Sequence, residues 1–506
     1  MSVNRAALPK PLYTADQTRS LDRIAIEEFG IPGIRLMQRA GHAVFAEIVE
    51  RFPQLKSISI FAGAGNNGGD GLIIALLARQ KNIDVQLICV GSEDFPEKLQ
   101  GEARQAWKLL GEINGEYELY KPGMAIRGDL IVDALLGTGL SGDVRGLFRD
   151  AINQINAAST QVIAVDIPSG ICADTGRVLG EAVVSDITVS FIGLNRGLLT
   201  GDAVNYCGEV LFDNLKVPDE AYAKVPTVVH RTTQQDLQRL LPQRERSSHK
   251  GKNGHLLIVG GNLGMGGAAL LASEAAIRSG AGLVSLATRT EHLTASLSRS
   301  PEVMCHGVEK VADLKPLIFK ADVVVIGPGL GQNAWAEQML REVLATHKKV
   351  VLDADALNLM VEKELFNPDD DLESICTPHP GEASRILTKP VAELLQDRFK
   401  TLDELQSRCG GAVVLKGAGS LSTAGKMISL CNKGNPGMAV GGMGDVLSGI
   451  CGAFLCQGLD TEEAAAMAVY VHAAAADLIA EDQGEIGLLP SDLCQVIPRV
   501  INNSDE

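Results

Sequence analysis

The chain alternates short apolar runs with helical stretches, and it does so twice. In its first half the apolar runs occupy residues 57–62, 85–90, 129–136, 161–166 and 187–192. In its second half they occupy residues 255–259, 283–287, 323–326, 350–353 and 412–415, before an Ala-rich helical stretch over about residues 461–480. Continuous apolar runs separated by helices are typical of strands that are buried on both faces of a parallel sheet. The sequence therefore predicts an α/β protein made of two tandem doubly wound domains.

A polar segment that contains prolines separates the two alternations. It covers residues 216–254, contains Pro218, Pro226 and Pro242, and ends in a polar stretch over residues 243–254. Such a composition is typical of the junction between domains. With 506 residues, the chain is long enough for two or more domains. We predict a first domain over residues 1–225 and a second over residues 226–506.

Two helices are predicted before the first apolar run. Thr14 followed by Gln17 matches a capping box, and Gly30 and Pro32 are expected to end the helix that it begins. A second helix is expected over about residues 34–52.

Charge and composition exclude several classes of protein. There are 46 Lys and Arg residues against 62 Asp and Glu, and the net charge of −16 repels nucleic acid and anionic membranes. The most apolar stretch, residues 464–480, carries His472 and Asp477 and is not expected to cross a membrane. Residues 1–16 show no apolar segment of a secretory signal, so we expect a cytoplasmic protein. Its expected partners are small molecules, with no nucleic acid or membrane, and it is expected to form a homo-oligomer.

The ten cysteines are expected to be small core residues. None is spaced as Cys-x-x-Cys, which fits neither a structural zinc site nor a disulfide scaffold.

A glycine-rich loop follows the first apolar run and opens a helix. Residues 63–71 read Gly-Ala-Gly-Asn-Asn-Gly-Gly-Asp-Gly and formally contain the GxGxxG pattern of dinucleotide sites. Tight strand-to-helix turns also need glycine, so the pattern alone is weak. Asp70 argues against a bound pyrophosphate, because its carboxylate would compete for the same backbone N–H groups. Asn66 and Asn67 offer carbonyl oxygens, which are good ligands for a hard cation.

Two further predicted strands end in aspartates. Asp133 begins the segment 133–143, and Asp166 begins the segment 166–170, which continues Ile-Pro-Ser-Gly. The carboxyl ends of neighbouring parallel strands meet at one edge of a sheet, so these segments and the loop 63–71 should converge there. A single aspartate at a strand end is usually a helix cap. Several that converge repel one another unless a cation lies among them, so we expect a cation site.

The most informative stretch of the second half is residues 434–449, with glycines at 434, 437, 441, 442, 444 and 449 and an aspartate at 445. Glycines at the start of an apolar helix leave backbone amides free to hold an anion, and Asp445 lies among them. Such an arrangement can hold a transferring phosphoryl group while the carboxylate accepts a hydroxyl proton. A flexible turn with a capping aspartate is the alternative. No Gly-x4-Gly-Lys-Ser/Thr motif is present, so a P-loop is excluded.

Other polar loops of the second half agree with a ligand site. His379 and Glu382 are too sparse for a zinc site, and we expect them to meet a ligand and a water molecule of Mg²⁺. Lys416 is a candidate phosphate clamp, with ordinary solvent exposure as the alternative. The remaining loops occupy residues 260–268, 327–331, 353–358 and 416–420.

The motifs of the first half resemble the NAD(P)H-hydrate epimerase domain. The resemblance covers most of residues 10–220 and rests on residues 12–15, 30–33, 66–70, 133–139 and 166–170. It implies a Rossmann-like three-layer domain, a K⁺ site and a site for the hydrated nicotinamide nucleotide. The implied K⁺ ligands are Asn67, Asp133 and Ser169. The implied substrate-binding residues are Asn66, Asn67, Gly68, Gly69, Asp70, Gly137, Thr138, Gly139, Leu140, Ser141, Gly142, Asp143 and Asp166, of which Asp166 is our candidate catalytic acid/base.

The motifs of the second half resemble the ribokinase-like superfamily, and within it the nucleotide-dependent NAD(P)H-hydrate dehydratase domain. Met443 stands where the kinases commonly have alanine, which agrees with the dehydratase pattern. The implied substrate-binding residues are Ala268, Gly329, His379 and Asp445, with Asp445 as catalytic base. The implied nucleotide-binding residues are Lys416, Gly417, Ala418, Gly419, Ser420 and Gly444. Mg²⁺ and ADP are the implied cofactors, ADP by analogy with fused chains of this type.

Together the two resemblances predict a bifunctional repair enzyme. It would interconvert the R and S forms of hydrated NADH and NADPH and dehydrate the S form with ADP, giving AMP and phosphate. The main alternative is a ribokinase-like small-molecule kinase with a non-catalytic amino-terminal domain. A dehydrogenase is a further alternative, against which Asp70 and the two asparagines before it argue.

Overall fold

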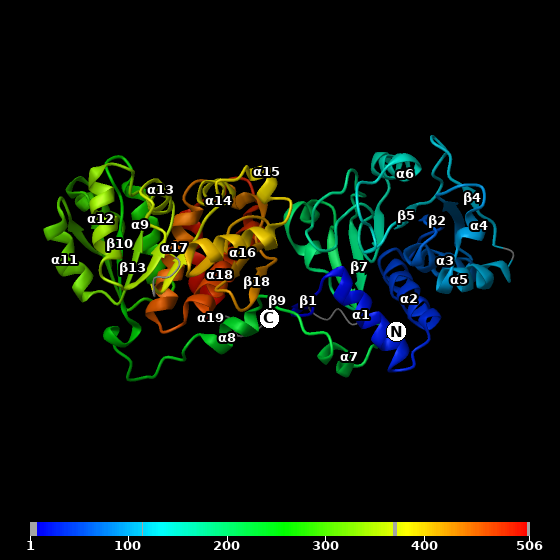
Figure 1. Cartoon of the computed structure of the whole chain (residues 1–506), viewed down its shortest axis with the longest axis horizontal. Helices are drawn as coiled ribbons and strands as arrows, with labels where there is room; N and C mark the ends of the chain where they lie inside the picture. Colours follow the sequence, from blue (N-terminus) through cyan, green and yellow to red (C-terminus); the bar gives the residue numbers. More distant parts are fainter. Residues whose placement is uncertain (1–7, 114, 368–371, 503–506) are drawn as a thin grey trace. The chain divides into compact units, whose positions relative to one another are not determined.

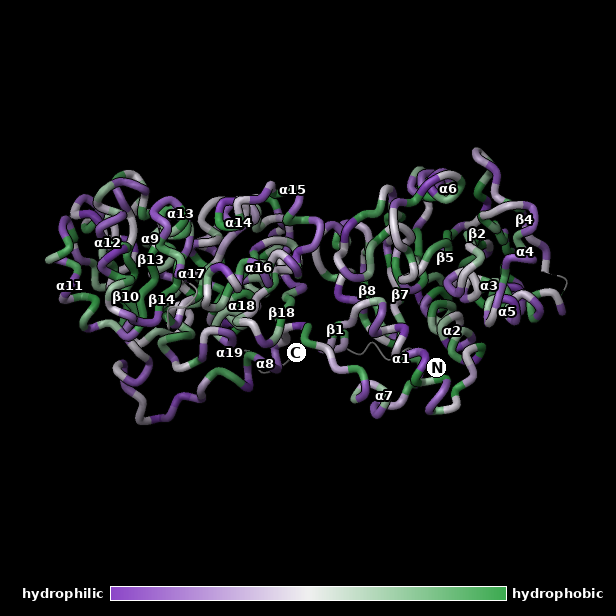
Figure 2. Tube along the Cα trace, viewed as in Figure 1, coloured by the Kyte–Doolittle hydropathy of each residue, from purple (hydrophilic) through white to green (hydrophobic). Residues whose placement is uncertain are grey.

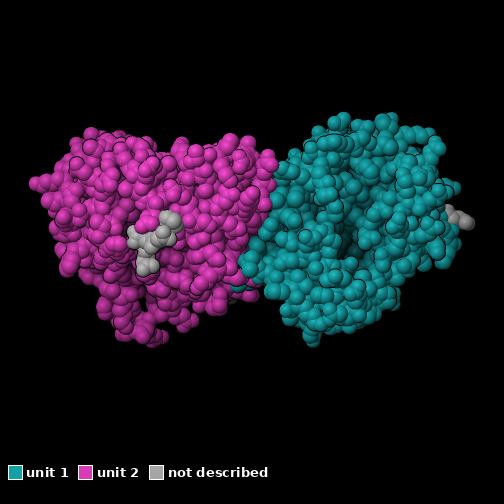
Figure 3. All heavy atoms as spheres, in the orientation of Figure 1, with its two compact units in different colours: residues 1–229 teal, residues 230–506 magenta. Residues whose placement is uncertain are grey.

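A computed structural model of the chain describes residues 8–113, 115–367 and 372–502. The chain forms two compact units, residues 1–229 and 230–506 (Figure 3). The boundary after Val229 lies four residues beyond the end of the first domain as the sequence placed it.

Unit 1 is built on a parallel sheet with the strand order β4-β3-β2-β5-β6-β7-β8, and each neighbouring pair in it is parallel (Figure 1). The strands of the unit are β1 (Pro11–Leu12), β2 (Ser57–Ala62), β3 (Asp84–Cys89), β4 (Glu118–Leu119), β5 (Leu130–Ala134), β6 (Val162–Val165), β7 (Ile187–Phe191) and β8 (Glu209–Asp213). The helices are α1 (Ala15–Glu27), α2 (Gly33–Arg51), α3 (Asn66–Gln80), α4 (Phe95–Lys98), α5 (Gly101–Gly111), α6 (Gly146–Ala157) and α7 (Asp219–Ala223). The predicted capping box of the first helix is present, with Thr14 and Gln17 each accepting the other's backbone N–H.

Both faces of this sheet are covered, as continuous apolar strands require. On β2, Ile58 and Ile60 point into a core shared with helices α1, α2, α3 and α5. Phe61 points to the other face, into a second core that includes Ile152 and Ile155 of α6. This alternation follows from the period of two along a strand. Figure 2 shows hydrophobic residues concentrated along the strands of the unit.

Unit 2 contains a second sheet, with the order β18-β17-β16-β15-β14-β13-β10-β11-β12. The pairs from β16 to β12 are parallel, while β17 and β18 are added antiparallel at one side. The strands are β10 (His255–Val259), β11 (Leu283–Thr288), β12 (Met304–Gly307), β13 (Val323–Ile326), β14 (Lys349–Leu352), β15 (Ser374–Cys376), β16 (Ala412–Leu415), β17 (Ser420–Thr423) and β18 (Ile428–Cys431), and β9 (Val229–Arg231) crosses the unit boundary. The helices are α8 (Gln234–Leu240), α9 (Gly266–Arg278), α10 (Leu293–Arg299), α11 (Val311–Lys320), α12 (Ala334–Leu344), α13 (Asp355–Glu362), α14 (Pro380–Leu387), α15 (Val391–Leu394), α16 (Arg398–Cys409), α17 (Met443–Cys456), α18 (Thr461–Gln483) and α19 (Pro490–Asn502).

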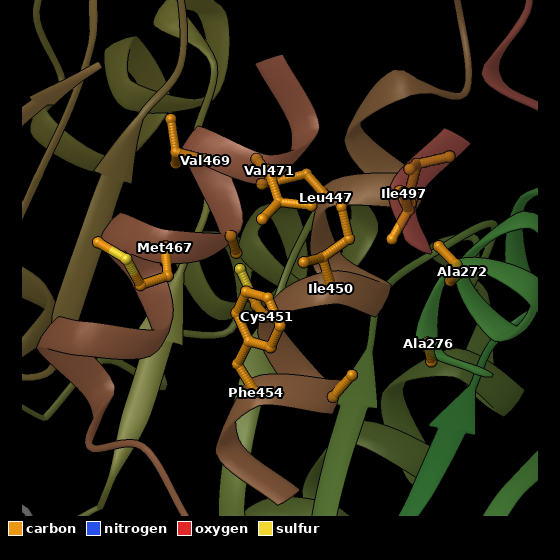
Figure 4. Close-up of a cluster of buried hydrophobic side chains, with 14 of the residues drawn as sticks. Ala272, Ala276, Leu447, Ile450, Cys451, Phe454, Met467, Val469, Val471 and Ile497 are labelled. Atoms are coloured by element: carbon orange, nitrogen blue, oxygen red, sulfur yellow. The ribbon is translucent and has the colours of Figure 1, made fainter. Parts of the chain in front are cut away.

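Helix α17 lies in the main core of unit 2. Its side chains Leu447, Ile450 and Phe454 pack in one buried cluster with side chains of α9, α18 and α19 (Figure 4). Gly449 permits this packing, because a Cβ there would lie 2.2 Å from the carbonyl oxygen of Ala272 on α9. The close approach fixes the position of α17, and with it the glycine-rich loop at its start.

Helix α18 is the predicted Ala-rich helix. Among the described residues it is the one helix whose length and apolar composition suit a membrane span, and 78% of its most apolar window is buried inside the structure.

The predicted fold class is confirmed: both sheets are mainly parallel and are combined with helices in α/β units. Four predicted strands, β2, β10, β13 and β16, have the expected bounds, and the others differ by one or two residues at one or both ends. The strands that were not predicted are β1, β4, β8, β9, β12 and β15 and the antiparallel pair β17 and β18.

Candidate functional sites

In unit 1, three polar loops follow the neighbouring strands β2, β5 and β6 at their carboxyl ends. They are residues 63–71, 135–143 and 166–170, the segments expected to converge. A Cβ placed on Gly63 would lie 2.0 Å from the carbonyl oxygen of Leu135, and one on Gly68 would lie 1.8 Å from that of Gly63. These two glycines are therefore required for close packing of the backbone.

Asp133 and Ser169 form a buried hydrogen-bonded pair in this region. Both side chains are completely buried. Asp133 accepts hydrogen bonds from the backbone N–H (2.8 Å) and hydroxyl (2.6 Å) of Ser169 and from the N–H of Leu135 (3.2 Å). Burial raises the pKa of Asp133 to about 6, although these hydrogen bonds oppose the shift. A bound cation would stabilise the ionised form of this buried carboxylate.

Asn67 is the third predicted cation ligand. It is 7% exposed, and both polar atoms of its side-chain amide are buried with no hydrogen-bond partner in the described part of the chain. Buried amides without partners are rare, because the loss of hydration is not compensated. Asn67 and Asp166 flank Gly137: a Cβ on Gly137 would lie 3.2 Å from Cβ of Asn67 and 3.4 Å from Oδ2 of Asp166.

Asp166 has an unusual backbone conformation. Its φ is +66°, in the left-handed region that a residue other than glycine rarely adopts. Its N–H donates to the carbonyl oxygen of Val189 (2.8 Å), which holds this conformation. Burial raises the pKa of the Asp166 carboxyl to about 6, and hydrogen bonds from the backbone and hydroxyl of Thr138 oppose the shift. Near neutral pH the carboxyl can therefore both donate and accept a proton.

Two further carboxylates, those of Asp70 and Asp22, contribute to the electrostatics of this region. Burial raises the pKa of Asp70 well above its ordinary value, and the charges of Asp166 and Asp22 add to the shift. Asp22 lies on α1, and burial and the charge of Glu102 raise its pKa. Asp22 was not predicted as a site residue, because nothing in a helical pattern distinguishes it from an ordinary surface aspartate.

The remaining predicted substrate residues of unit 1 differ in exposure. Gly68 and Gly69 are buried, Asn66 is exposed, and Gly137, Thr138 and Leu140 are half-buried. Gly139, Ser141, Gly142 and Asp143 are exposed, and Asp143 lies 3.9 Å from the guanidinium of Arg145.

In unit 2, polar loops follow the neighbouring strands β10, β13, β14, β15 and β16, and the start of α17 lies beside them. A Cβ on Gly329 would lie 3.1 Å from Cβ of Ala268, so these two predicted substrate residues are in contact. A Cβ on Gly444 would lie 3.3 Å from Nζ of Lys416 and 3.7 Å from Oδ2 of Asp353. The N–H of Gly331 also donates to Oδ2 of Asp355 (2.8 Å). The structure thus brings together five of the predicted segments, residues 260–268, 327–331, 353–358, 416–420 and 434–449.

Lys416 is held by two carboxylates. Its Nζ lies 3.1 Å from Oδ1 of Asp353 and 3.7 Å from Oε2 of Glu382. Burial alone would lower the pKa of Lys416, but the two carboxylates raise it above its ordinary value. Lys416 is therefore charged, and its charge is already balanced within the protein.

Asp353 is a central residue of this site and was not among the predicted site residues. It is 1% exposed and also accepts a hydrogen bond from the hydroxyl of Thr377 (2.7 Å). The residue after it, Ala354, has φ +47°, a strained conformation between two acidic residues. The rule that selected Asp133 and Asp166, an aspartate at a strand end, would have found Asp353 as well.

Asp445 lies in the first turn of α17, after Gly442, which has φ +102°. Burial raises the pKa of Asp445 to about 7; Asp353 adds to the shift and Lys416 opposes it. A carboxylate with such a pKa is suited to accept a proton at neutral pH.

His379 caps helix α14. Its Nδ1 accepts the N–H of Gly381 (2.9 Å), and its own N–H donates to Oε2 of Glu382 (2.8 Å). Nε2 of His379 lies 3.4 Å from Oε1 of Glu382. Burial lowers the pKa of His379, and Glu382 opposes the shift.

The loop of residues 416–420 follows β16. Gly417 and Ala418 are exposed, and Gly419 is buried. The N–H of Gly417 donates to Oγ of Ser420 (3.3 Å), whose hydroxyl donates back to the carbonyl oxygen of Gly417 (2.8 Å). The buried side chain of Arg398 lies beneath this loop, and no sequence pattern pointed to it.

Fold and sites together define a two-unit α/β enzyme whose second unit is ribokinase-like. Residues 256–499 match the family model described as NAD(P)H-hydrate dehydratase, and residues 33–197 match that described as YjeF-related protein N-terminus. The chain belongs to the family of bifunctional NAD(P)H-hydrate repair enzymes, which combine an epimerase and a dehydratase.

Relatives of known name match over nearly their whole length. The bifunctional NAD(P)H-hydrate repair enzyme Nnr of Coxiella burnetii is 44% identical over 492 residues, 97% of this chain and 99% of the relative. The Nnr enzyme of Escherichia coli is 40% identical over 504 residues, 99% of this chain and 96% of the relative. A solved ribokinase-like protein from Enterococcus faecalis is 32% identical with a TM-score of 0.51, covering 55% of this chain and 96% of that chain.

Proposed function

We propose that Asp166 is the acid/base of the epimerase in unit 1, and that Asp445 is the base of an ADP-dependent dehydratase in unit 2. The substrates are the hydrated forms of NADH and NADPH. The observation that carries the proposal is that each aspartate is buried among strand-end loops and has a pKa raised to near neutral, about 6 for Asp166 and about 7 for Asp445. Asp133 also has a pKa of about 6, but its carboxylate is held by hydrogen bonds from Ser169 and Leu135.

Epimerisation requires that the hydrated ring centre opens and closes again. Proton transfer to and from the ring accompanies both steps, and a carboxyl with a pKa of about 6 can serve in either direction. Residues 66–70 and 137–143 would hold the nucleotide around Asp166. The fixed φ of Asp166 keeps the carboxyl in place beside Gly137.

A K⁺ ion fits the group formed by Asn67, Asp133 and Ser169. The amide of Asn67 has unpartnered polar atoms, and the carboxylate of Asp133 is buried without a cationic partner among the described residues. These side chains offer oxygen atoms, which hard cations prefer. The ion would supply positive charge to this edge of the sheet.

Dehydration requires that a poor leaving group, hydroxide, becomes a good one. In the proposed reaction the ring hydroxyl attacks the terminal phosphorus of ADP, its proton passes to Asp445, and the bond from that phosphorus to AMP breaks. The carbon–oxygen bond then breaks, phosphate leaves, and loss of a proton from the neighbouring ring carbon restores the double bond. The products are NAD(P)H, AMP and phosphate.

Different residues around Asp445 would bind the two substrates. Ala268, Gly329 and His379 would hold the hydrated nucleotide, and residues 416–420 with Gly444 would hold ADP. The free amides at the start of α17 would stabilise the phosphoryl group. The charges of Asp353, Asp355 and Glu382 act on Asp445, and Lys416 opposes them, so this region has an excess of negative charge. Mg²⁺ would bind here mainly through the phosphates and water molecules and neutralise charge on the phosphates; His379 and Glu382 would meet one of its water molecules.

The experiment uses the purified chain with chemically hydrated NADH that contains both epimers, in the presence of Mg²⁺ and K⁺. Absorbance at 340 nm is followed with ADP or with ATP, and AMP and phosphate are quantified. We expect full recovery of NADH from both epimers with ADP. Recovery limited to the S fraction would overturn the epimerase assignment, and a stable phosphorylated product would favour the small-molecule kinase.

The proposal also includes a cytoplasmic location and a homo-oligomeric state. Light scattering on the purified chain tests the second, and a monomer at micromolar concentration would contradict it.

A further inference from the structure

Arg398 is a buried cation that pairs with no carboxylate of the described residues. It is the first residue of α16, and 3% of its surface is exposed. Its Nε has no hydrogen-bond partner, and no charged group of the described residues shifts its pKa. Burial lowers that pKa to about 10, so the guanidinium is still charged at neutral pH.

Neither the helix nor the core explains this residue. A cation at the amino end of a helix is disfavoured by the positive end of the helix dipole. Burial of an unpaired charge is also unfavourable, because the loss of hydration is not compensated. A buried charge of this kind is expected where an anion balances it.

The side chain lies directly beneath the loop of residues 416–420. Its Nη2 donates to the carbonyl oxygens of Gly419 (3.3 Å) and Leu415 (3.4 Å). Gly417 has φ +141°, and a Cβ there would lie 2.6 Å from Nη1 of Arg398. The loop backbone therefore lies against the guanidinium, with no side chain between them at this glycine.

The other cation of this loop is already neutralised. Lys416 is paired with Asp353 and Glu382, whereas Arg398 is not paired with any carboxylate in the described part of the chain. Of these two positive charges, that of Arg398 is available to a bound anion.

We propose that Arg398 is a positioning residue of the nucleotide site, whose buried charge is balanced by the phosphate groups of a nucleotide held on residues 416–420. Its hydrogen bonds to Leu415 and Gly419 fix the loop, and its charge favours the diphosphate over the uncharged nucleoside. This inference rests on the proposed function, which places the nucleotide on this loop.

The test compares Arg398→Met, which removes the charge at similar length, with Arg398→Lys, which keeps it. Arg408→Met is the matched control, because Arg408 is an exposed arginine on the same helix. Equilibrium binding of ADP and of adenosine to the full chain is measured by calorimetry with Mg²⁺, together with the KM for ADP and kcat.

We expect Arg398→Met to weaken ADP binding and raise its KM by about tenfold or more, as for loss of a charge-assisted contact. Adenosine affinity and kcat at saturating ADP should change by no more than about threefold, which is clearly smaller than the tenfold effect expected for ADP. Arg398→Lys should retain most of the ADP affinity, and Arg408→Met should bind both ligands as the parent does.

Three results would overturn the inference: unchanged ADP affinity in Arg398→Met, equal loss of ADP and adenosine, or a loss in Arg398→Lys as large as in Arg398→Met. If Arg398→Met does not fold, Arg398→Lys still decides, since it must retain the preference for ADP over adenosine. If the parent chain binds neither ADP nor ATP, the proposed function itself fails.

Discussion

Asn67, in the first turn of α3, has a buried side-chain amide whose oxygen and nitrogen have no hydrogen-bond partner among the described residues. Such a group lowers stability unless a ligand satisfies it. Its exposed neighbour Asn66 carries the same chemical group without that cost. The pair therefore offers a test at the scale of one residue.

We predict that Asn67→Ala removes the response of the epimerase to K⁺. Activity in K⁺ should fall by about tenfold or more, as for loss of one oxygen contact to a charged group. The measurement is the conversion of the R to the S form in K⁺ and in a buffer without K⁺. Asn66→Ala is the control and should keep the K⁺ response; a K⁺ response that survives in Asn67→Ala would contradict the assignment.

The pKa of Asp445 predicts the pH dependence of the dehydratase. A base must be ionised to accept a proton, and the pKa of this carboxyl is raised to about 7. The rate at saturating substrates should therefore rise as the pH increases through about 7 and level off above it. Asp445→Asn should lower kcat by about 100-fold or more, within the range for loss of a general base. A rate independent of pH between 5.5 and 8 would contradict this role.

At the scale of elements, α17 is placed by glycines as much as by its apolar side chains. Gly449 faces the backbone of α9, and a Cβ on Gly452 would lie 2.6 Å from the side chain of Val325 on β13. Bulkier residues would push the helix away from the sheet. The catalytic loop at its start would then move with it.

We predict that Gly449→Ala lowers the free energy of unfolding of unit 2 by about 2 kcal/mol, a typical cost of overpacking. The physical reason is the 2.2 Å approach of the new Cβ to the carbonyl oxygen of Ala272. Gly267→Ala on α9 is the matched control. A Cβ on Gly267 would meet no heavy atom within 4 Å, so this change should stabilise the helix by about 1 kcal/mol or less. Urea unfolding measures both, and equal stabilities would contradict the packing argument.

Strands of both sheets were predictable where they are apolar and at least four residues long. Strands β2, β10 and β13 are mainly apolar runs between glycines or charged residues, so their bounds are visible in the sequence. β15 has three residues, and β17 and β18 mix apolar residues with serine or threonine, so none of the three gives a strong local signal. Their place in the sheet depends on pairing with neighbours distant in sequence.

At the scale of the whole molecule, each unit has its own core and its own candidate site. The site of unit 1 lies on residues 63–71, 133–143 and 166–170, and that of unit 2 on residues 260–268, 327–331, 353–382, 416–420 and 442–445. Two separate sites can act in sequence if the site of unit 1 releases the S form and the site of unit 2 then binds it.

We predict that an equimolar mixture of the Asp166→Asn and Asp445→Asn chains recovers NADH from both epimers. Each chain would supply the activity that the other lacks, because the two aspartates belong to different units. Alone, Asp166→Asn should rapidly recover the S fraction, and Asp445→Asn should recover neither. The measurement is absorbance at 340 nm with ADP. Failure of the mixture would show that the two activities require one intact chain.

The sequence by itself determined the two mainly parallel sheets and the loops that carry Asp133, Asp166 and Asp445. These follow from local signals, since apolar runs, glycine turns and strand-end carboxylates are each contained in a short segment of the sequence. Only the tertiary structure decided that Lys416 is neutralised by Asp353 and Glu382, that Asn67 is left without partners, and that Arg398 lies beneath residues 416–420. The physical reason is that ion pairing and burial depend on distances between segments far apart in sequence, which no local pattern specifies.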